Sequence, residues 1–269
     1  MPSDPIPAIK EFWEGQAARQ ELPEDLITHR DRNQRLLEIE LLSKYLPSGK
    51  RILDIGCGNG FSTAVFAKSA AEIVGIDYAP AMIERAKRNF GHVPNVSFRS
   101  QDVLSLDFPP DSFDVVISQR CLINLGTWDN QQKAISNIAN VVKPGGFFFL
   151  QEGTRQGRAR LNEVRELLGL SRMPSVPFNL DFDEEILWPY VRRYFDVVEI
   201  RRFGLYDLIS RVVHPLLVNP SEPVYDAKIN DIARRVSVEL RGMDDLSREF
   251  SAFLRRRVQT TSTAVPLSC

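Results

Sequence analysis

Short apolar runs alternate along the chain with segments whose apolar residues recur at helical spacing. Five of these runs have the length and composition of buried strands, and helical segments separate most of them. The expected strands are 51–55, 71–76, 96–99, 113–118 and 147–151, with helices at 60–69, 80–90 and 127–142. This alternation favours an α/β fold in which an open parallel sheet is covered by helices on both faces.

Strands and helices alternate less regularly on either side of this region. Helices are expected at 7–20 and 33–46 before it, and at 155–169, 182–194 (with Asp181 as N-cap) and 224–241 after it. Two further strands are expected at 197–202 and 250–257. We therefore divide the chain into N-terminal helices (1–47), an α/β core (48–204), a helical insertion (205–249) and a last strand with a frayed end (250–269).

The composition is that of an ordinary globular protein, with 43% hydrophobic and 26% charged residues. The formal net charge of −1 gives no global electrostatic reason to expect a nucleic-acid partner. No apolar run reaches the roughly 18 residues that a membrane span needs, and the N-terminus lacks the apolar core of a signal peptide. Three widely spaced cysteines (Cys57, Cys121 and Cys269) fit a reducing cytoplasm better than disulfides or zinc, so we expect no metal site.

The loop after the first expected strand contains a glycine at every second position. Asp54 precedes Gly56, Gly58 and Gly60, and a helical segment follows. Glycine permits a sharp turn and a close approach of a ligand to the backbone. A dinucleotide-binding loop would have its third glycine one position later, where this chain has Phe61. The loop therefore predicts a cofactor other than a dinucleotide, and the carboxylate of Asp54 suits a cationic ligand.

Acidic residues also follow the second and third expected strands. Asp77 comes 21 residues after Gly56, a spacing at which a carboxylate accepts hydrogen bonds from ribose hydroxyls. Asp102 is placed to accept from an adenine amino group, with Val103 packing on the ring. Because the carboxyl ends of parallel strands lie at one edge of the sheet, these residues should meet in one site.

Five motifs in order resemble those of class I S-adenosylmethionine-dependent methyltransferases. They are Asp54–Gly60, Asp77–Tyr78, Asp102–Val103, 113–118 and 142–147, and the resemblance covers roughly residues 48–155. It implies a Rossmann-like, doubly wound, mostly parallel sheet of seven strands whose last strand is antiparallel. It also implies S-adenosyl-L-methionine as the cofactor, capped by the N-terminal helices.

The resemblance assigns roles to individual residues. Asp77 would hold the ribose, Asp102 the adenine, and Gln119 would face the methionine part of the cofactor. Arg30 or Arg32 would pair with its carboxylate, a charge-assisted contact. The expected cofactor-binding residues are Arg32, Asp54, Gly56, Cys57, Gly58, Asp77, Tyr78, Met82, Asp102, Val103 and Gln119.

Methyl transfer from a sulfonium requires mainly that the enzyme align the acceptor with the donor, although an alcohol acceptor usually also needs a base. The expected bases are His29, His214 and Glu152, and the expected acceptor contacts are Arg120, Asn124 and Tyr206. The insertion is expected to form the acceptor pocket or its lid. The segment after the fourth strand lacks the Asn/Asp-Pro-Pro-Tyr-type tetrapeptide of many enzymes that methylate nucleic-acid bases, which again argues against a nucleic-acid substrate.

The sequence therefore predicts a cytoplasmic methyltransferase that acts on a small molecule, with O-methylation of a sugar or another metabolite as the leading hypothesis. N-methylation of a small amine and non-catalytic binding of S-adenosylmethionine are the alternatives, and Phe61 disfavours a nicotinamide-dependent oxidoreductase. The acceptor and the oligomeric state are not predicted.

Overall fold

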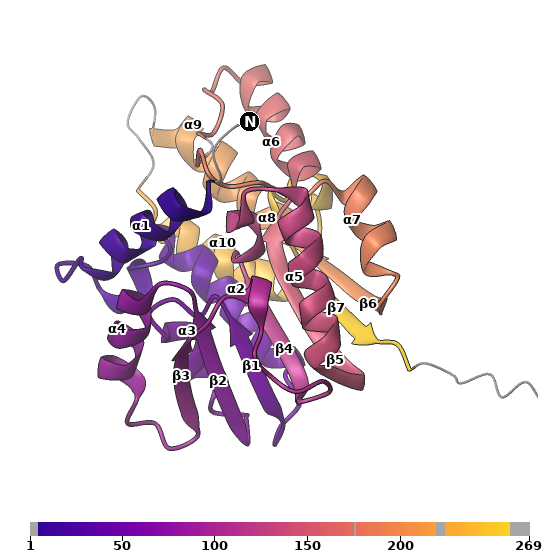
Figure 1. The fold of residues 1–269 in the computed structure, drawn as a ribbon. Helices are drawn as coiled ribbons and strands as arrows, with labels where there is room; N and C mark the ends of the chain where they lie inside the picture. The colour runs from indigo at the N-terminus through magenta and orange to yellow at the C-terminus, as the bar shows by residue number, and fades with distance from the viewer. Residues whose placement is uncertain (1–4, 175, 219–223, 259–269) are drawn as a thin grey trace, which may run out of the picture.

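The computed structural model describes residues 5–174, 176–218 and 224–258. Cys269 and most of the expected frayed end lie outside the described residues. Seven strands form a single sheet in the order β3-β2-β1-β4-β5-β7-β6 (Figure 1). The strands are β1 (Arg51–Ile55), β2 (Glu72–Asp77), β3 (Val96–Ser100), β4 (Phe113–Gln119), β5 (Val142–Gly153), β6 (Phe195–Arg202) and β7 (Glu249–Arg256).

Helices connect and cover these strands. The α-helices are α1 (Ile6–Ala17), α2 (Arg32–Tyr45), α3 (Phe61–Phe66), α4 (Pro80–Phe90), α5 (Trp128–Val141), α6 (Arg155–Leu167), α7 (Glu184–Val191), α8 (Gly204–Leu208), α9 (His214–Val218) and α10 (Lys228–Glu239). Shorter turns are η1 (Glu24–Leu26), η2 (Val103–Ser105), η3 (Leu122–Leu125), the π-helical η4 (Ile209–Val213) and η5 (Asp244–Leu246). Within the described part of the chain, none of these helices combines the length and apolarity needed to cross a membrane.

The sheet has a hydrophobic core on each face, because successive side chains of a strand point in opposite directions. Leu53 packs with α5 and α7 on one side, whereas Ile52 packs with α2, α3 and α10 on the other. β1 to β5 pair in parallel, and β7 is inserted antiparallel between β5 and β6. The predicted fold class, including the antiparallel last strand, is confirmed.

Two local predictions differ from the structure. Asp183, not Asp181, is the N-cap of α7, because its carboxylate accepts from the amide of Glu185 while that of Asp181 pairs with Arg158. The segment 143–146, which lies between the expected helix 127–142 and the expected strand 147–151, belongs to β5. A shift in the register between β4 and β5 accommodates it.

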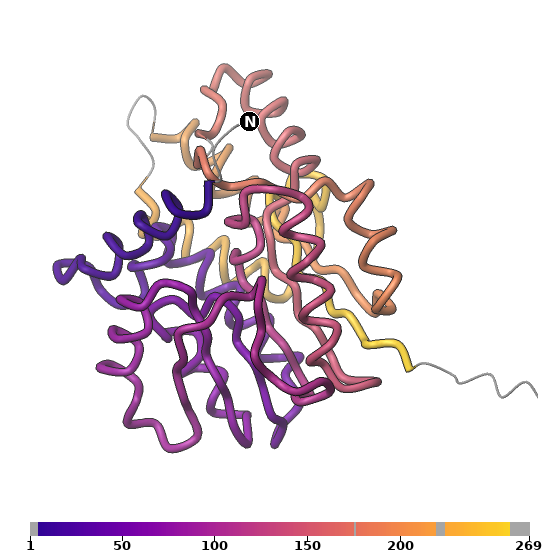
Figure 2. The backbone as a smooth tube through the Cα atoms, in the orientation of Figure 1, coloured from indigo at the N-terminus to yellow at the C-terminus, as the bar shows by residue number. Residues whose placement is uncertain are grey.

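The carboxyl edge of the parallel strands is covered by two sets of segments, one before the α/β core and one after it. Figure 2 shows the indigo N-terminal segment and the orange segments after β6 lying at the same end of the sheet. Phe12 of α1 packs against Phe178, with ring centroids 4.8 Å apart. These covering segments convert the open edge of the sheet into an enclosed site.

Candidate active site

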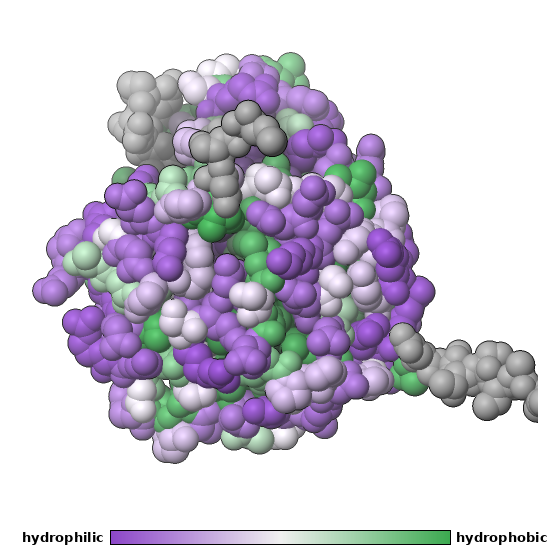
Figure 3. Space-filling model, viewed as in Figure 1, coloured by the Kyte–Doolittle hydropathy of each residue, from purple (hydrophilic) through white to green (hydrophobic). Residues whose placement is uncertain are grey.

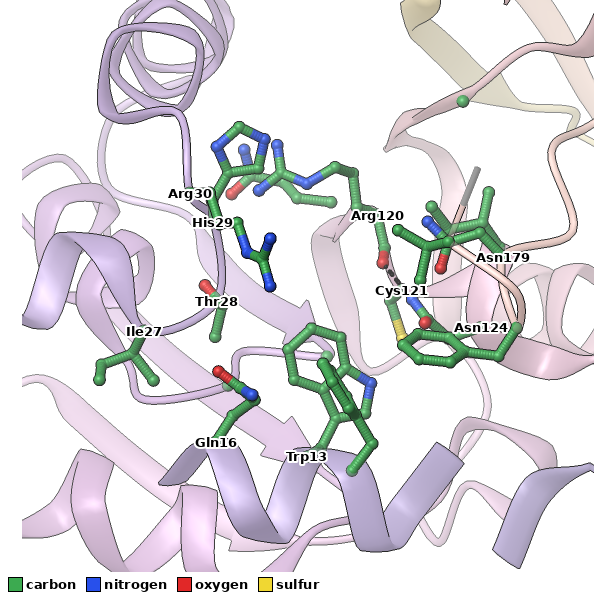
Figure 4. A pocket seen from close by; sticks show the side chains of 18 of the residues that line it. Trp13, Gln16, Ile27, Thr28, His29, Arg30, Arg120, Cys121, Asn124 and Asn179 are labelled. Atoms are coloured by element: carbon green, nitrogen blue, oxygen red, sulfur yellow. Dashed lines mark hydrogen bonds between the residues drawn. The ribbon is translucent and has the colours of Figure 1, made fainter. Parts of the chain in front are cut away.

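A pocket of about 590 Å³ lies at this edge of the sheet. Apolar residues surround a hollow in the face that Figure 3 shows. In Figure 4, His29 and Arg120 lie together on one side, Arg30 points into the middle, and Trp13 lies across from them. The volume is in the range of small-molecule and cofactor sites.

The pocket has two parts that we describe separately. The strand-end half is lined from the β1, β2, β3 and β4 ends by Gly56, Gly58, Asp77, Tyr78, Met82, Gln101, Asp102, Val103 and Gln119. The distal half is lined by Trp13, His29, Arg30, Arg120, Asn124, Met173, Phe178, Arg211, Arg248 and Glu249.

The glycine loop forms the floor of the strand-end half. Gly56 and Gly58 have left-handed φ angles of 69° and 53°, which glycine adopts without strain. A Cβ at Gly56 would lie 2.5 Å from the Cβ of Cys121, and one at Gly58 would lie 2.7 Å from the Cγ2 of Thr28. Glycine is thus required both by the turn and by neighbours that themselves line the pocket.

Asp77 connects this loop to the end of β2. Its two carboxylate oxygens accept from the amides of Gly58 at 3.0 Å and Ala79 at 2.9 Å. Burial raises the pKa of Asp77 to about 6, so the carboxylate is mostly ionised at pH 7. Each oxygen keeps a further lone pair for a ligand that donates hydrogen bonds, such as a diol.

Unpartnered polar atoms next to Asp102 show that the strand-end half fits a polar ligand. Asp102 accepts from the amide of Leu104 at 2.8 Å. The hydroxyl of Tyr78 and Oε1 of Gln101 are buried and have no hydrogen-bond partner within the described chain. Buried polar groups are normally paired, and the hydroxyls and amino group of a nucleoside would supply the missing partners.

The structure brings most of the expected site residues to this pocket. Its lining includes His29, Gly56, Gly58, Asp77, Tyr78, Met82, Asp102, Val103, Gln119, Arg120 and Asn124. It does not include Arg32, Asp54, Cys57, Glu152, Tyr206 or His214. The second group requires correction, residue by residue.

Arg32 is turned away from the pocket and pairs with Asp25 at 2.5 Å. The arginine that the loop before α2 directs into the pocket is Arg30, which makes no ion pair with any described residue (Figure 4). Of the two arginines predicted for a cofactor carboxylate, the structure therefore favours Arg30.

The side chains of Asp54 and Cys57 pack behind the glycine loop. Asp54 accepts from the hydroxyl of Thr63 at 2.6 Å, and burial raises its pKa to about 7. The amide of Cys57 donates to the carbonyl of Ile76 at 2.9 Å, and its side chain packs with Phe98 in a small apolar cluster. Both residues therefore support the loop without lining the pocket.

Glu152 is fully buried and holds the segment that follows β4. Oε1 accepts from Ser118 and from the amides of Cys121 and Leu122 at 3.1, 3.1 and 2.9 Å, and Oε2 accepts from the amide of Ile123 at 3.3 Å. Burial nevertheless raises the pKa of Glu152 to about 8. Its carboxylate positions η3 and does not line the pocket. Glu152 is therefore not placed to act as the expected catalytic base.

Tyr206 and His214 come from the segments after β6 and are both buried. The hydroxyl of Tyr206 donates to the carboxylate of Asp31, at 2.9 and 2.8 Å from its two oxygens. Asp31 in turn caps α2 by accepting from the amide of Gln34 at 3.1 Å. Tyr206 therefore positions a pocket residue from behind, and His214 is not part of the lining.

His29 lines the pocket, but it is poorly suited to accept a proton. Burial and the positive charge of Arg120 lower the pKa of His29 to about 3. The imidazole is therefore neutral at pH 7 and a weak base. Its Nδ1 lies 2.6 Å from the carbonyl oxygen of Asp31.

The distal half also contains ion pairs whose members, except for the expected Arg120, the sequence did not indicate. Arg120 pairs with Glu38, Arg211 with Asp31, and Arg248 with Asp207. Glu38 is in the middle of α2, between two buried apolar residues, which is an unusual position for a carboxylate. That position is the one signal in the sequence from which this cluster could have been anticipated.

Comparison with known proteins identifies the central part of the chain. Residues 52–146, from β1 into β5, match the family described as "Methyltransferase domain". This region carries the glycine loop and the strand-end residues. It is a class I S-adenosylmethionine-dependent methyltransferase domain. The predicted family and its cofactor class are thereby confirmed.

Curated relatives match part of the chain. A demethylmenaquinone methyltransferase of Tropheryma whipplei (strain Twist) is 35% identical over 99 residues, which is 37% of this chain and 40% of that protein. A ubiquinone biosynthesis O-methyltransferase of Coxiella burnetii (strain Dugway 5J108-111) is 32% identical over 117 residues, or 43% of this chain and 49% of that protein. The match thus spans less than half the length of each relative.

A solved structure is similar over most of the chain. The N-methyltransferase NodS from Bradyrhizobium japonicum WM9, crystallised with S-adenosyl-L-homocysteine, superposes with a TM-score of 0.55 at 17% identity. The superposition covers 92% of this chain and 98% of NodS. The fold of the methyltransferase domain with its flanking segments is therefore shared with NodS.

Proposed function

We propose that this protein transfers a methyl group from S-adenosylmethionine to an oxygen of a small molecule. The observation that carries the proposal is that one pocket joins a half built from the strand ends to a second half built from segments outside the methyltransferase domain. A methyl donor in the first half would face an acceptor in the second. The reaction needs this alignment more than it needs a strong acid or base.

In the strand-end half we assign Asp77 to the ribose hydroxyls and Asp102 to the adenine amino group. Tyr78, Met82 and Val103 would pack on the adenosine. The loop at Gly56 and Gly58, together with Gln119, would face the methionine part, and Arg30 would pair with its carboxylate.

In the reaction, an acceptor oxygen attacks the methyl carbon while the bond from that carbon to sulfur breaks. The electron pair of this bond goes to sulfur, and the hydroxyl proton of the acceptor leaves to water. Asn124 is placed to orient the acceptor, because its amide nitrogen donates to the carbonyl of Arg120 at 2.8 Å. Its Oδ1 is buried without a partner within the described chain and is free to accept from a hydroxyl.

The lining of the distal half favours an acceptor with an apolar body and a polar end. Trp13, Met173 and Phe178 form an apolar wall, and the arginines and acids form a polar floor. The two curated relatives named above are quinone-pathway methyltransferases by their printed names, and nothing in those names supports a sugar. We therefore propose a ring-containing hydroxyl compound ahead of a saccharide.

The proposal is tested by measuring S-adenosylhomocysteine release with panels of phenolic or quinol, saccharide and amine acceptors. Turnover with the phenolic or quinol panel is expected, at a rate at least tenfold above that with amines. Turnover with amines alone would replace O-methylation by N-methylation. Binding of S-adenosylmethionine without turnover of any panel would favour the non-catalytic alternative.

A further inference from the structure

Three residues at the floor of the distal half converge on one point. A ring nitrogen of His29 and carboxylate oxygens of Glu38 and Glu249 all lie within 4.8 Å of one another. They come from the loop before α2, from the middle of α2 and from the first residue of β7. From this convergence we infer a site for a divalent metal ion held by His29, Glu38 and Glu249.

The two carboxylates are in an arrangement that requires a cation or a proton. Glu38 is fully buried and Glu249 is 5% exposed. Oε1 of Glu38 and Oε2 of Glu249 have no hydrogen-bond donor among the described residues. Two buried carboxylates in contact repel each other unless a positive charge lies between them.

Three neighbouring arginines form their ion pairs with other carboxylates. Arg120, Arg211 and Arg248 form ion pairs with Glu38, Asp31 and Asp207 respectively. In the part of the chain that the structure describes, no ion pair reaches Glu249. Arg120 and Arg248 place positive charge near Glu249 without forming an ion pair with it, so a bound cation would be its direct ionic partner.

The surroundings of His29 orient its ring as a metal ligand. Its Nδ1 lies 2.6 Å from the carbonyl oxygen of Asp31 and 3.2 Å from the amide nitrogen of Asp31, so each tautomer finds a partner there. A bound ion would select the tautomer with the proton on Nδ1, which donates to the carbonyl at the shorter distance. Nε2 then presents its lone pair. Histidines that bind metals commonly donate the other ring N–H to a carbonyl or carboxylate in this way.

One imidazole with two carboxylates suits Mn²⁺, Fe²⁺ or Zn²⁺ better than Mg²⁺, which prefers a shell of oxygens alone. His29 and Glu249 line the pocket, whereas Glu38 is fully buried. The open coordination positions therefore face the acceptor.

An ion at this position would coordinate the acceptor oxygen and lower the pKa of its hydroxyl. This would supply an activation that Glu152 and His214, which do not line the pocket, do not supply. This role rests on the proposed function, whereas binding of the ion does not depend on it.

The site is tested by titrating the full chain with Mn²⁺, following free Mn²⁺ by electron paramagnetic resonance, and repeating the titration calorimetrically with Zn²⁺. One Mn²⁺ per chain is expected, and Glu249→Gln and His29→Ala should each weaken binding at least tenfold. His92→Ala, which removes an exposed imidazole outside the pocket, is the matched control and should bind as the unmodified chain does.

S-adenosylhomocysteine binding is measured on the same preparations. This measurement distinguishes a misfolded variant from a specific loss of metal binding, and a failure of the metal site from a failure of the proposed function. Variants that bind it normally but have lost Mn²⁺ would support the site. If the unmodified chain binds S-adenosylhomocysteine but neither metal, the metal site is overturned. A proton shared by Glu38 and Glu249 would then explain how the two carboxylates lie together. Metal binding that is unchanged in both variants would also overturn the site, and metal binding without S-adenosylhomocysteine binding would sink the proposed function alone.

Discussion

The two halves of the pocket are built in opposite ways. The strand-end half is formed by short segments that directly follow strands, and its two acids are held by nearby backbone amides, Asp77 by those of Gly58 and Ala79 and Asp102 by that of Leu104. The distal half depends on residues far apart in the chain, such as the pocket residue Asp31 and Tyr206 behind it, which are 175 positions apart. A ligand-binding loop of the first kind is a local property of the sequence, whereas a charge cluster of the second kind exists only after folding.

This difference implies that substitutions in the two halves have separable effects. The largest effect on cofactor affinity is expected from Asp77→Ala. It removes an ionised acceptor of two hydroxyl hydrogen bonds, each of which contributes about 1.5–3 kcal/mol. Calorimetry should show that affinity for S-adenosylhomocysteine falls by about 100-fold or more. Asp111→Asn, on an exposed turn, is the control and should leave the affinity unchanged. A loss below threefold in Asp77→Ala would mean that Asp77 does not hold the ribose.

The next largest effect should come from pH, through the same carboxyl. With a pKa of about 6, Asp77 is mostly ionised at pH 7 and mostly protonated at pH 5, so affinity for S-adenosylhomocysteine should fall by about tenfold between them. The folding free energy changes in the opposite sense. Since the pKa is raised from 3.8, Asp77 stabilises the ligand-free fold below that pH and loses this contribution as the pH rises through 6. Asp77→Asn should remove both dependences, and a pH profile of affinity unchanged in Asp77→Asn would contradict the assignment.

A smaller effect is expected from Gly58→Ala. The new Cβ would contact Cγ2 of Thr28 at 2.7 Å, at a φ of 53° that costs about 1–2 kcal/mol for residues other than glycine. Cofactor affinity should therefore fall five- to tenfold. Adding Thr28→Ser removes the contacting methyl and should restore part of the loss, as the thermal shift with S-adenosylhomocysteine would show. No rescue would indicate that backbone strain alone is responsible.

The smallest effect on the cofactor is expected from Tyr206→Phe, behind the distal half. Removing the hydroxyl deprives the buried Asp31 of a donor and should lower the free energy of unfolding by about 1–3 kcal/mol in denaturant titrations. Affinity for S-adenosylhomocysteine should stay within twofold, while the KM for an acceptor rises. A joint loss of cofactor affinity would show that the two halves are not separable.

The same contrast explains how much the sequence predicted. Periodicity and the glycine loop placed all seven strands, and strand-end acids placed Asp77 and Asp102 in the pocket. The prediction was wrong for a residue that lies at a strand end but whose side chain points elsewhere. Glu152 is at the end of β5, yet its carboxylate turns to the amides of η3.

The distal half was largely beyond prediction for a geometric reason. Glu249 is the first residue of the antiparallel β7 and pairs with Gly153. An antiparallel strand starts at the edge where the parallel strands end, so this site residue begins a strand instead of following one. Arg32 and Arg30 were indistinguishable because the turn before α2 decides which of them faces the pocket. Pairing between distant residues, such as Arg120 with Glu38, leaves no local pattern.

The central claim is that the strand-end half holds the adenosyl cofactor and presents its methyl group to the distal half. The most direct test is a crystal structure of the full chain with S-adenosylhomocysteine. We predict the ribose hydroxyls at Asp77, the adenine amino group at Asp102 and the sulfur directed toward Arg120 and Asn124. A nucleoside bound elsewhere, or a sulfur directed away from the distal half, would contradict the account.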